Sequence, residues 1–379
     1  MSKTDYEPHR HIAVFGPIAF DLFFDESAQE IGFTPKWGGC GLNQALTIDR
    51  LCRAYGKGGG AYLVSSVGPD FYKNRTEAEF QGHSSHDILG SLRYTTPVLH
   101  KSDTPTTSFK VPAPIEDISS ISNKRVRDRI EARHHRLESL YENTGEGRAY
   151  YDFRDPKVVV SLLNRLANIG YLGIISVTGG FVEAQPTIIN AIRSYKQGGE
   201  NTIIYYDPGP DMRKNPKLVE SQLSKIDILR SNQDETYLLT GNIHTGPQRL
   251  MASHKNLMAI ITTRATEISI YHKEGQDVVR TVCSGLPYIR TGELSTIGCG
   301  DVLGGTLLWY LEQQPIIDPS TIIKGLELGM TVVYDYLSQK PKLGSAGMTR
   351  FIPDDVHIQN RLPHVYTVTK SRTAFRNFK

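Results

Sequence analysis

Cysteine is scarce in this chain, and no stretch of it is apolar enough to cross a membrane. The four cysteines, Cys40, Cys52, Cys283 and Cys299, show no CxxC spacing and no nearby pair of histidines, so neither a zinc site nor a disulfide framework is indicated. No window approaches the roughly 18 continuous apolar residues of a membrane span, and the first residues contain no apolar stretch of signal-peptide length. We therefore expect a cytoplasmic protein with reduced thiols and no membrane partner.

A strong excess of charge of one sign is also absent. The chain carries 43 Lys and Arg residues against 40 Asp and Glu residues, which gives a formal net charge of +3. Nucleic-acid-binding domains usually show a basic face or stripe, so we expect no nucleic-acid partner. The basic residues over 124–138 are a local exception, but their mixture with acidic residues is typical of a solvated helix.

The sequence does contain a repeated alternation of strand-like and helix-like segments. A helix is predicted over 41–55, ended by Gly56, and strands are predicted at 12–15, 61–67, 173–177, 202–206, 226–229, 257–262, 267–271 and 278–283. This alternation predicts an α/β protein with a mostly parallel central sheet and helices on both faces, in three layers α/β/α. At 379 residues the chain has room for one large domain of this kind or for two domains.

Short strands with polar alternation interrupt this rhythm. They predict a small β-sheet lid drawn from about 18–37, 93–111 and 149–153, with a helical insert at about 115–147. We place the body at 11–350 and treat 351–379 as a C-terminal extension.

The segment from Gly298 to Asp301 carries the clearest chemistry. Gly298, Cys299 and Gly300 are small residues directly before a strongly apolar helix, so the amide N–H groups of its first turn are open to a ligand. Unpaired N–H groups and the positive end of a helix dipole favour a phosphate. Asp301 stands where it can accept a proton from an attacking hydroxyl, although an acidic residue in a first turn also occurs simply to complement the dipole.

A second polar segment runs from Trp37 to Ala45. Gly38, Gly39 and Gly41 allow a sharp turn into a helix, and Asn43 supplies an amide that both donates and accepts hydrogen bonds. Asp21, on an early strand, suits two neighbouring hydroxyls. Together they predict recognition of a polyol, although a glycine cluster by itself is weak evidence.

In this order the segments resemble the ribokinase, or pfkB, family of carbohydrate and nucleoside kinases over about 12–348. The quoted motifs are GGCGLNQA, SVGPD ending at Asp70, DPGP at 207–210, SNQDE with Asn232 and Glu235, and STIGCGD. The resemblance implies a three-layer α/β body with a small lid and transfer of the ATP γ-phosphate to an alcohol.

Residue by residue, the resemblance makes Asp301 the catalytic base and Gly298, Cys299 and Gly300 the anion hole. It implies acceptor binding by Asp21, Gly38, Gly39 and Asn43, and nucleotide binding by Asn232, Thr262, Arg264, Gly298 and Gly300. It also implies Mg²⁺ held by Asn232 and, through water, by Glu235. Asn232 with Glu235 three residues later is equally the pattern of a helix capping box, and both roles are compatible.

The chain departs from the family pattern at four positions, one of them Cys299 in place of the usual small Ala. Ser295 stands where the family has Asp, which weakens the expectation of a monovalent-cation site, and Arg264 and Glu267 replace two glycines that line the nucleotide phosphates. Arg264 is expected either to meet phosphate with its guanidinium or to obstruct ordinary ATP geometry.

Four interpretations follow. The leading one is a carbohydrate kinase that uses ATP and Mg²⁺ and phosphorylates a small-molecule acceptor. The sequence leaves open whether it forms a homodimer through the lid. A nucleoside kinase of the same family and a catalytically reduced member that binds ligand and regulates a partner are the alternatives. A nicotinamide-dependent oxidoreductase fits poorly, because the first strand is not followed by GxGxxG.

Overall fold

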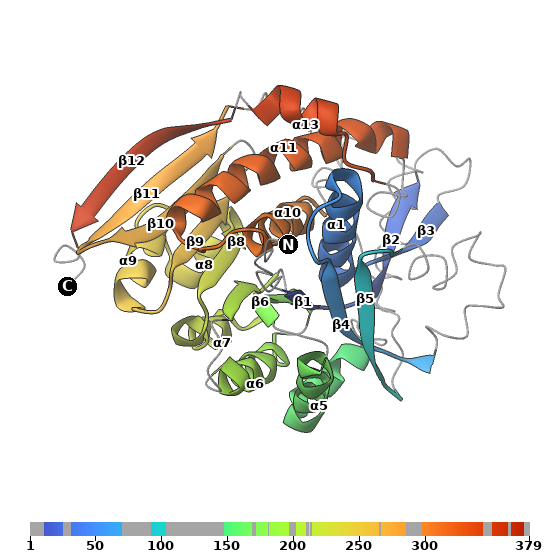
Figure 1. Cartoon of the computed structure of the whole chain (residues 1–379). Coiled ribbons are helices and arrows are strands. Elements are labelled where there is room, and N and C mark those ends of the chain that lie inside the picture. The colour runs from blue at the N-terminus through green and yellow to red at the C-terminus, as the bar shows by residue number, and fades with distance from the viewer. Residues whose placement is uncertain are drawn as a thin grey trace, which may run out of the picture.

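A ten-stranded sheet forms the centre of the described part of the molecule (Figure 1). The structure is a computed structural model and describes residues 11–25, 32–69, 92–103, 148–168, 172–180, 182–196, 202–209, 212, 214–264, 267–285, 298–343, 351–362 and 365–374. The strand order is β12-β11-β10-β9-β8-β7-β6-β1-β4-β5. In chain order the strands are β1 (His11–Phe15), β4 (Ala61–Val67), β5 (Thr95–Lys101), β6 (Leu172–Thr178), β7 (Ile203–Asp207), β8 (Ile228–Asn232), β9 (Ala259–Thr263), β10 (Ile268–Glu274), β11 (Asp277–Ser284) and β12 (Tyr366–Ala374).

The sheet is parallel from β5 to β9 and antiparallel from β9 to β12. The inner parallel strands, such as β4, β6 and β7, are buried on both faces, which explains why their sequences are nearly continuous apolar runs. The carboxyl ends of parallel strands meet at one edge, where open α/β sheets usually bind ligands.

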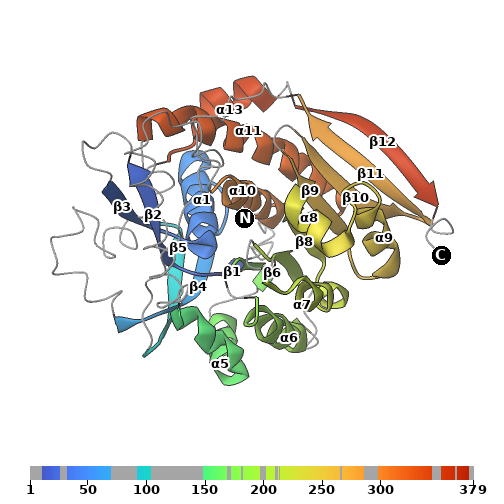
Figure 2. The same cartoon turned by 180° about the vertical axis from the view of Figure 1, so that it is seen from behind.

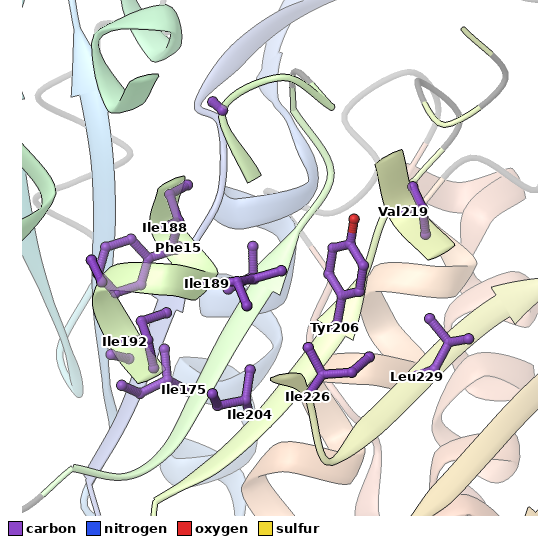
Figure 3. Close-up of a cluster of buried hydrophobic side chains, with 14 of the residues drawn as sticks. Phe15, Ile175, Ile188, Ile189, Ile192, Ile204, Tyr206, Val219, Ile226 and Leu229 are labelled. Atoms are coloured by element: carbon purple, nitrogen blue, oxygen red, sulfur yellow. The ribbon is translucent and has the colours of Figure 1, made fainter. Parts of the chain in front are cut away.

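Helices cover both faces of the sheet (Figures 1 and 2). On one face α5 (Pro156–Ala167), α6 (Gln185–Lys196), α7 (Pro216–Glu220) and α9 (Gly246–Ser253) contribute to a core built around Phe15, Ile175 and Tyr206 (Figure 3). On the other face lie α1 (Cys40–Tyr55), α10 (Cys299–Glu312), α11 (Pro319–Leu343) and α13 (Asp355–Arg361). The predicted three-layer α/β/α body is therefore confirmed.

A separate two-stranded antiparallel sheet is formed by β2 (Ala19–Asp25) and β3 (Gly32–Gly38). It lies outside the main sheet on the side of α1 (Figures 1 and 2). Of the segments predicted for the lid, residues within 18–37 thus form a small sheet of their own.

Two of the other segments assigned to the lid belong to the main body of the fold. Residues 95–101 form β5, which pairs in parallel with β4 at the edge of the main sheet. An edge strand is partly exposed, and this gives it the polar alternation that suggested a lid. Residues 148–154 form a 3₁₀-helix, η2 (Arg148–Arg154), which buries Tyr150 and Phe153 in the main core. Residues 104–147, including the predicted helical insert, lie outside the described residues.

The C-terminal segment belongs to the body, and its description as an extension was wrong. β12 pairs antiparallel with β11 from Ser284 opposite Tyr366 to Asp277 opposite Ala374. Phe351 and Ile358 are fully buried in the core beside α11. Among the described residues, no helix combines the length and apolar character that crossing a membrane requires.

Candidate active site

The first turn of α10 is held open by a glycine in the left-handed region. Gly298 is the N-cap of α10 with φ of 85°, and its carbonyl accepts the Val302 amide at 2.9 Å. A positive φ of this size strains any residue with a Cβ. Gly298, Cys299 and Gly300 thus begin a helix with no side chain capping its N–H groups, as an anion site requires. Asp301 lies in this first turn.

The start of α1 is positioned by a close backbone contact. A Cβ on Gly16, just after β1, would lie 2.6 Å from the Cα of Gly41, so neither glycine leaves room for a side chain. Gly39 is the N-cap of α1 with φ of 94°, and its carbonyl accepts the Asn43 amide at 2.9 Å. The glycine turn therefore presses the first turn of α1 against the end of β1 and fixes the position of Asn43.

The two predicted halves of the site meet directly. Asn43 Nδ2 donates to Asp301 Oδ2 at 2.9 Å, across 258 positions of sequence. Asn43 is 5% exposed, so the hydrogen bond is largely sheltered from water. The structure thus places the proposed acceptor-binding amide beside the proposed catalytic carboxylate, at the meeting point of two helix N-termini.

A buried glutamine ties α1 to the sheet behind Asn43. Gln44 is fully buried, its Nε2 donates to Thr178 Oγ1 at 3.1 Å, and its Oε1 accepts from Ser176 Oγ at 2.9 Å. Sequence analysis did not single out Gln44, because only the sheet pairing shows that β6 supplies matching hydroxyls. The bonds fix the rotation of α1 and hence the direction of the neighbouring Asn43.

Asn232 and Glu235 form the predicted capping box. Asn232 is the N-cap of α8 (Gln233–Thr240); its Oδ1 accepts the Glu235 amide at 2.9 Å, and Glu235 Oε2 accepts the Asn232 amide at 2.8 Å. Glu235 is 2% exposed. Asn232 thus uses its single side-chain oxygen, and Glu235 one of its two carboxylate oxygens, in bonds to backbone amides. No cluster of three or more His, Cys, Asp or Glu side chains that could hold a metal occurs in the described ranges.

The two residues at the family's glycine positions pair with each other. Arg264 Nη1 lies 3.0 Å from Glu267 Oε1, and the Arg264 amide donates to the Glu267 carbonyl at 2.9 Å. Arg280 also approaches Glu267, at 3.4 Å. In this arrangement Glu267 holds one side of the Arg264 guanidinium and offsets its charge. Thr262 is buried in β9 and is 5% exposed.

Arg230 is a second residue that sequence analysis did not single out. It lies on β8, two residues before Asn232; its Nη1 donates to Asp207 Oδ2 at 3.0 Å and its Nη2 to Thr263 Oγ1 at 3.2 Å. A Cβ on Gly300 would lie 2.6 Å from Nη2 of this arginine. The available signal was an arginine inside an otherwise buried strand that leads into a motif.

The charges around Arg230 decide its ionisation. Burial alone would lower the pKa of Arg230, but the negative charges of Asp207, Glu235 and Asp301, together with Tyr205, raise it above its ordinary value. Burial, followed by the charge of Asp207, raises the pKa of Tyr205. The site thus keeps a permanent cation close to three carboxylates.

Other predicted positions are only partly placed. Asp21 stands opposite Lys36 in the β2–β3 pairing, and Gly38 ends β3 opposite Ala19. Asp70 and Ser295 lie outside the described residues.

The fold is similar to that of several solved kinases. Fructokinase from Vibrio cholerae O395, solved with fructose, ADP and calcium ion, aligns with a TM-score of 0.64 and 16% identity over 93% of this chain and 99% of that one. A nucleoside kinase from Burkholderia thailandensis in complex with inosine gives 0.55 and 16% identity over 93% and 97%. Adenosine kinase from Anopheles gambiae gives 0.59 and 13% over 92% and 99%.

No protein-family model matches the chain, and no curated protein matches it in sequence. The chain has the fold of the ribokinase-like sugar and nucleoside kinases, and the resemblance seen in its motifs is confirmed at the level of the fold.

Proposed function

We propose that this protein is an ATP-dependent phosphotransferase that moves the γ-phosphate to an alcohol group of a sugar or sugar-like small molecule. The observation that carries the proposal is the Asn43–Asp301 hydrogen bond of 2.9 Å at the first turn of α10. It brings a candidate base, a hydroxyl-binding amide and an open helix N-terminus into one place.

In the proposed reaction, the oxygen of the acceptor alcohol bonds to the γ-phosphorus while the bond from that phosphorus to the β–γ bridging oxygen breaks. The bond's electron pair stays on ADP, and Asp301 takes the hydroxyl proton. Phosphoryl transfer depends mainly on alignment and charge stabilisation, which the amides of Gly298, Cys299 and Gly300 provide. Asn43 orients the alcohol and gives up its bond to Asp301 when the alcohol is bound.

The residues present fit a nucleotide with its metal. Mg²⁺, when bound, would neutralise phosphate charge; Asn232 and, through water, Glu235 would hold it beside α8. Both side chains are fixed by the capping box, so their orientation at the start of α8 would already be set when a hydrated ion binds. A monovalent-cation site remains a weaker part of the proposal because of Ser295.

The acceptor is proposed to be a diol-bearing sugar. Asp21 and Asn43 are the two polar groups that suit vicinal hydroxyls, and the similar structures include a fructokinase with fructose and a nucleoside kinase with inosine. A nucleoside is therefore the second candidate, because its ribose offers the same diol.

The proposal is tested by screening sugars and nucleosides with MgATP, first by thermal shift and then by the rate of ADP formation. We expect one acceptor class to raise the melting temperature and to stimulate ADP formation. A protein that binds acceptor but neither MgATP nor MgADP would be a catalytically reduced, ligand-binding member of the fold, and the kinase proposal would be abandoned.

A further inference from the structure

Arg230 is a charged side chain that lies within the site and that the proposed mechanism does not use. Its guanidinium occupies the space directly over Gly300, where a Cβ would meet Nη2 at 2.6 Å, Nη1 at 2.7 Å and Cζ at 2.9 Å. The absence of a side chain at Gly300 therefore lets the arginine reach the first turn of α10.

The hydrogen bonds of Arg230 do not use all of its N–H donors. A guanidinium has five N–H donors, and Asp207 and Thr263 accept one bond each. The buried Nε has no partner in the described part of the chain. Buried polar groups are nearly always satisfied, so a buried donor without a partner requires an explanation.

The charge balance in the site also favours binding of a phosphate by Arg230. Asp207 is 4% exposed and neutralises Arg230 directly, while Glu235 and Asp301 contribute further negative charge around it. An incoming phosphate would add negative charge to this cluster of carboxylates, and Arg230 is the cation that offsets it.

We infer that Arg230 binds the transferred phosphoryl group, with unused guanidinium N–H groups donating to its oxygens opposite the amides of α10. The inference rests on the proposed function. It does not change which bonds form and break in the proposed reaction. Asp207 holds the guanidinium in place before the nucleotide arrives. Arginine suits this role because its planar fork matches phosphate geometry.

The position over Gly300, beside Asp301, selects the γ-phosphate over the β-phosphate. Arg230 therefore contributes little to binding of MgADP and more to binding of MgATP, and most of all to turnover. The three atoms nearest to a Cβ at Gly300 all belong to Arg230, whereas Arg264 pairs with Glu267.

The test compares Arg230→Gln and Arg230→Lys with the wild type. Calorimetry measures the affinities for MgADP and for a non-hydrolysable MgATP analogue, and initial rates of ADP formation give kcat. Arg53→Gln is the matched control, because it also removes an arginine from a partly buried ion pair, here with Asp49 at 3.4 Å. Arg53 lies in the last turn of α1, about 15 Å along the helix from Asn43 and therefore away from the site.

We expect Arg230→Gln to lower kcat about a hundredfold or more, the usual effect of removing one transition-state donor. Analogue affinity should fall about tenfold while MgADP affinity stays within about threefold. Arg230→Lys keeps a charge beside Asp207, so it should remain folded and show the same discrimination with a smaller loss of kcat. The control should match the wild type in all three quantities.

If Arg230 only braces Asp207, both variants melt at lower temperature but keep the wild-type ratio of analogue to MgADP affinity, and the inference is overturned. If Arg230→Gln does not fold, the affinity ratio of Arg230→Lys decides. A wild type that binds no nucleotide would refute the proposed function itself. An active wild type with fully active Arg230 variants would refute only the role of Arg230.

Discussion

The substitution Asp301→Asn separates catalysis from folding, because one atom changes and the shape is kept. Asp301 Oδ2 accepts from Asn43 Nδ2 at 2.9 Å, a bond to a charged group. Replacing it by a bond to a neutral amide, and removing a negative charge from the first turn of α10, costs stability by about 1 to 2 kcal/mol. Since domains are usually stable by roughly 5 to 15 kcal/mol, the variant stays folded.

The effect on turnover is expected to be larger. General base catalysis supplies about a hundred- to ten-thousand-fold, which corresponds to about 2.7 to 5.4 kcal/mol in the barrier. Asp301→Asn should therefore lose almost all ADP formation while acceptor affinity stays close to that of the wild type. Initial rates at saturating MgATP and acceptor, together with a melting curve, measure both effects.

Asp318→Asn is a matched control for this experiment. Asp318 precedes α11, and its Oδ1 accepts the Thr321 amide at 2.8 Å, so its loss also weakens a helix start. It should lower the melting temperature without lowering the rate. If Asp301→Asn retained more than about a third of the wild-type rate, far above the loss that base catalysis implies, Asp301 would not be the base.

The remaining predictions concern binding and pH. Asn43→Ala and Asp21→Ala should weaken acceptor binding by about 1 to 3 kcal/mol each, measured at saturating MgATP; loss of nucleotide affinity instead would mean that the two halves of the site are exchanged. Arg264→Ala should change MgATP affinity less than about threefold in calorimetry, because Glu267 already pairs with Arg264, and a tenfold loss would restore Arg264 as a phosphate ligand. Burial raises the pKa of Glu312 from 4.5 to about 7, so the folded state keeps a proton that the unfolded state releases, and stability should fall by up to about 3 kcal/mol as pH rises from 4.5 to about 7. Glu312→Gln should flatten this slope in urea titrations, and an unchanged slope would assign it to other groups.

The body of the fold was predictable because its inner parallel strands are buried on both faces. Such strands read as apolar runs, and the helices between them show one buried face. Strands at the sheet edges were not predictable in the same way: β5 is half exposed and was assigned to the lid, and β12 was not predicted at all. The position of an edge strand is set by pairing with its one neighbouring strand, and a local sequence pattern holds no information about that pairing.

The site divides along a similar line. The helix starts that carry Asp301 and Asn43, and the Asn232–Glu235 capping box, could be predicted, because each is a local motif. The place of Arg230 could not, since its guanidinium lies against Gly300, 70 positions away in the chain.

The hydrogen bond between Asn43 and Asp301 also bears on a side reaction, the hydrolysis of ATP by water. Under the proposed function, the Asn43 amide occupies one oxygen of Asp301 until an acceptor arrives, so that oxygen is not offered to a stray water molecule. An acceptor alcohol that hydrogen-bonds to Asn43 takes the amide away from Asp301. The Asp301 oxygen is then available when the productive nucleophile is in place. If Asp301 is the base, as we propose, the acceptor itself frees that base, and nucleotide is not wasted between substrates.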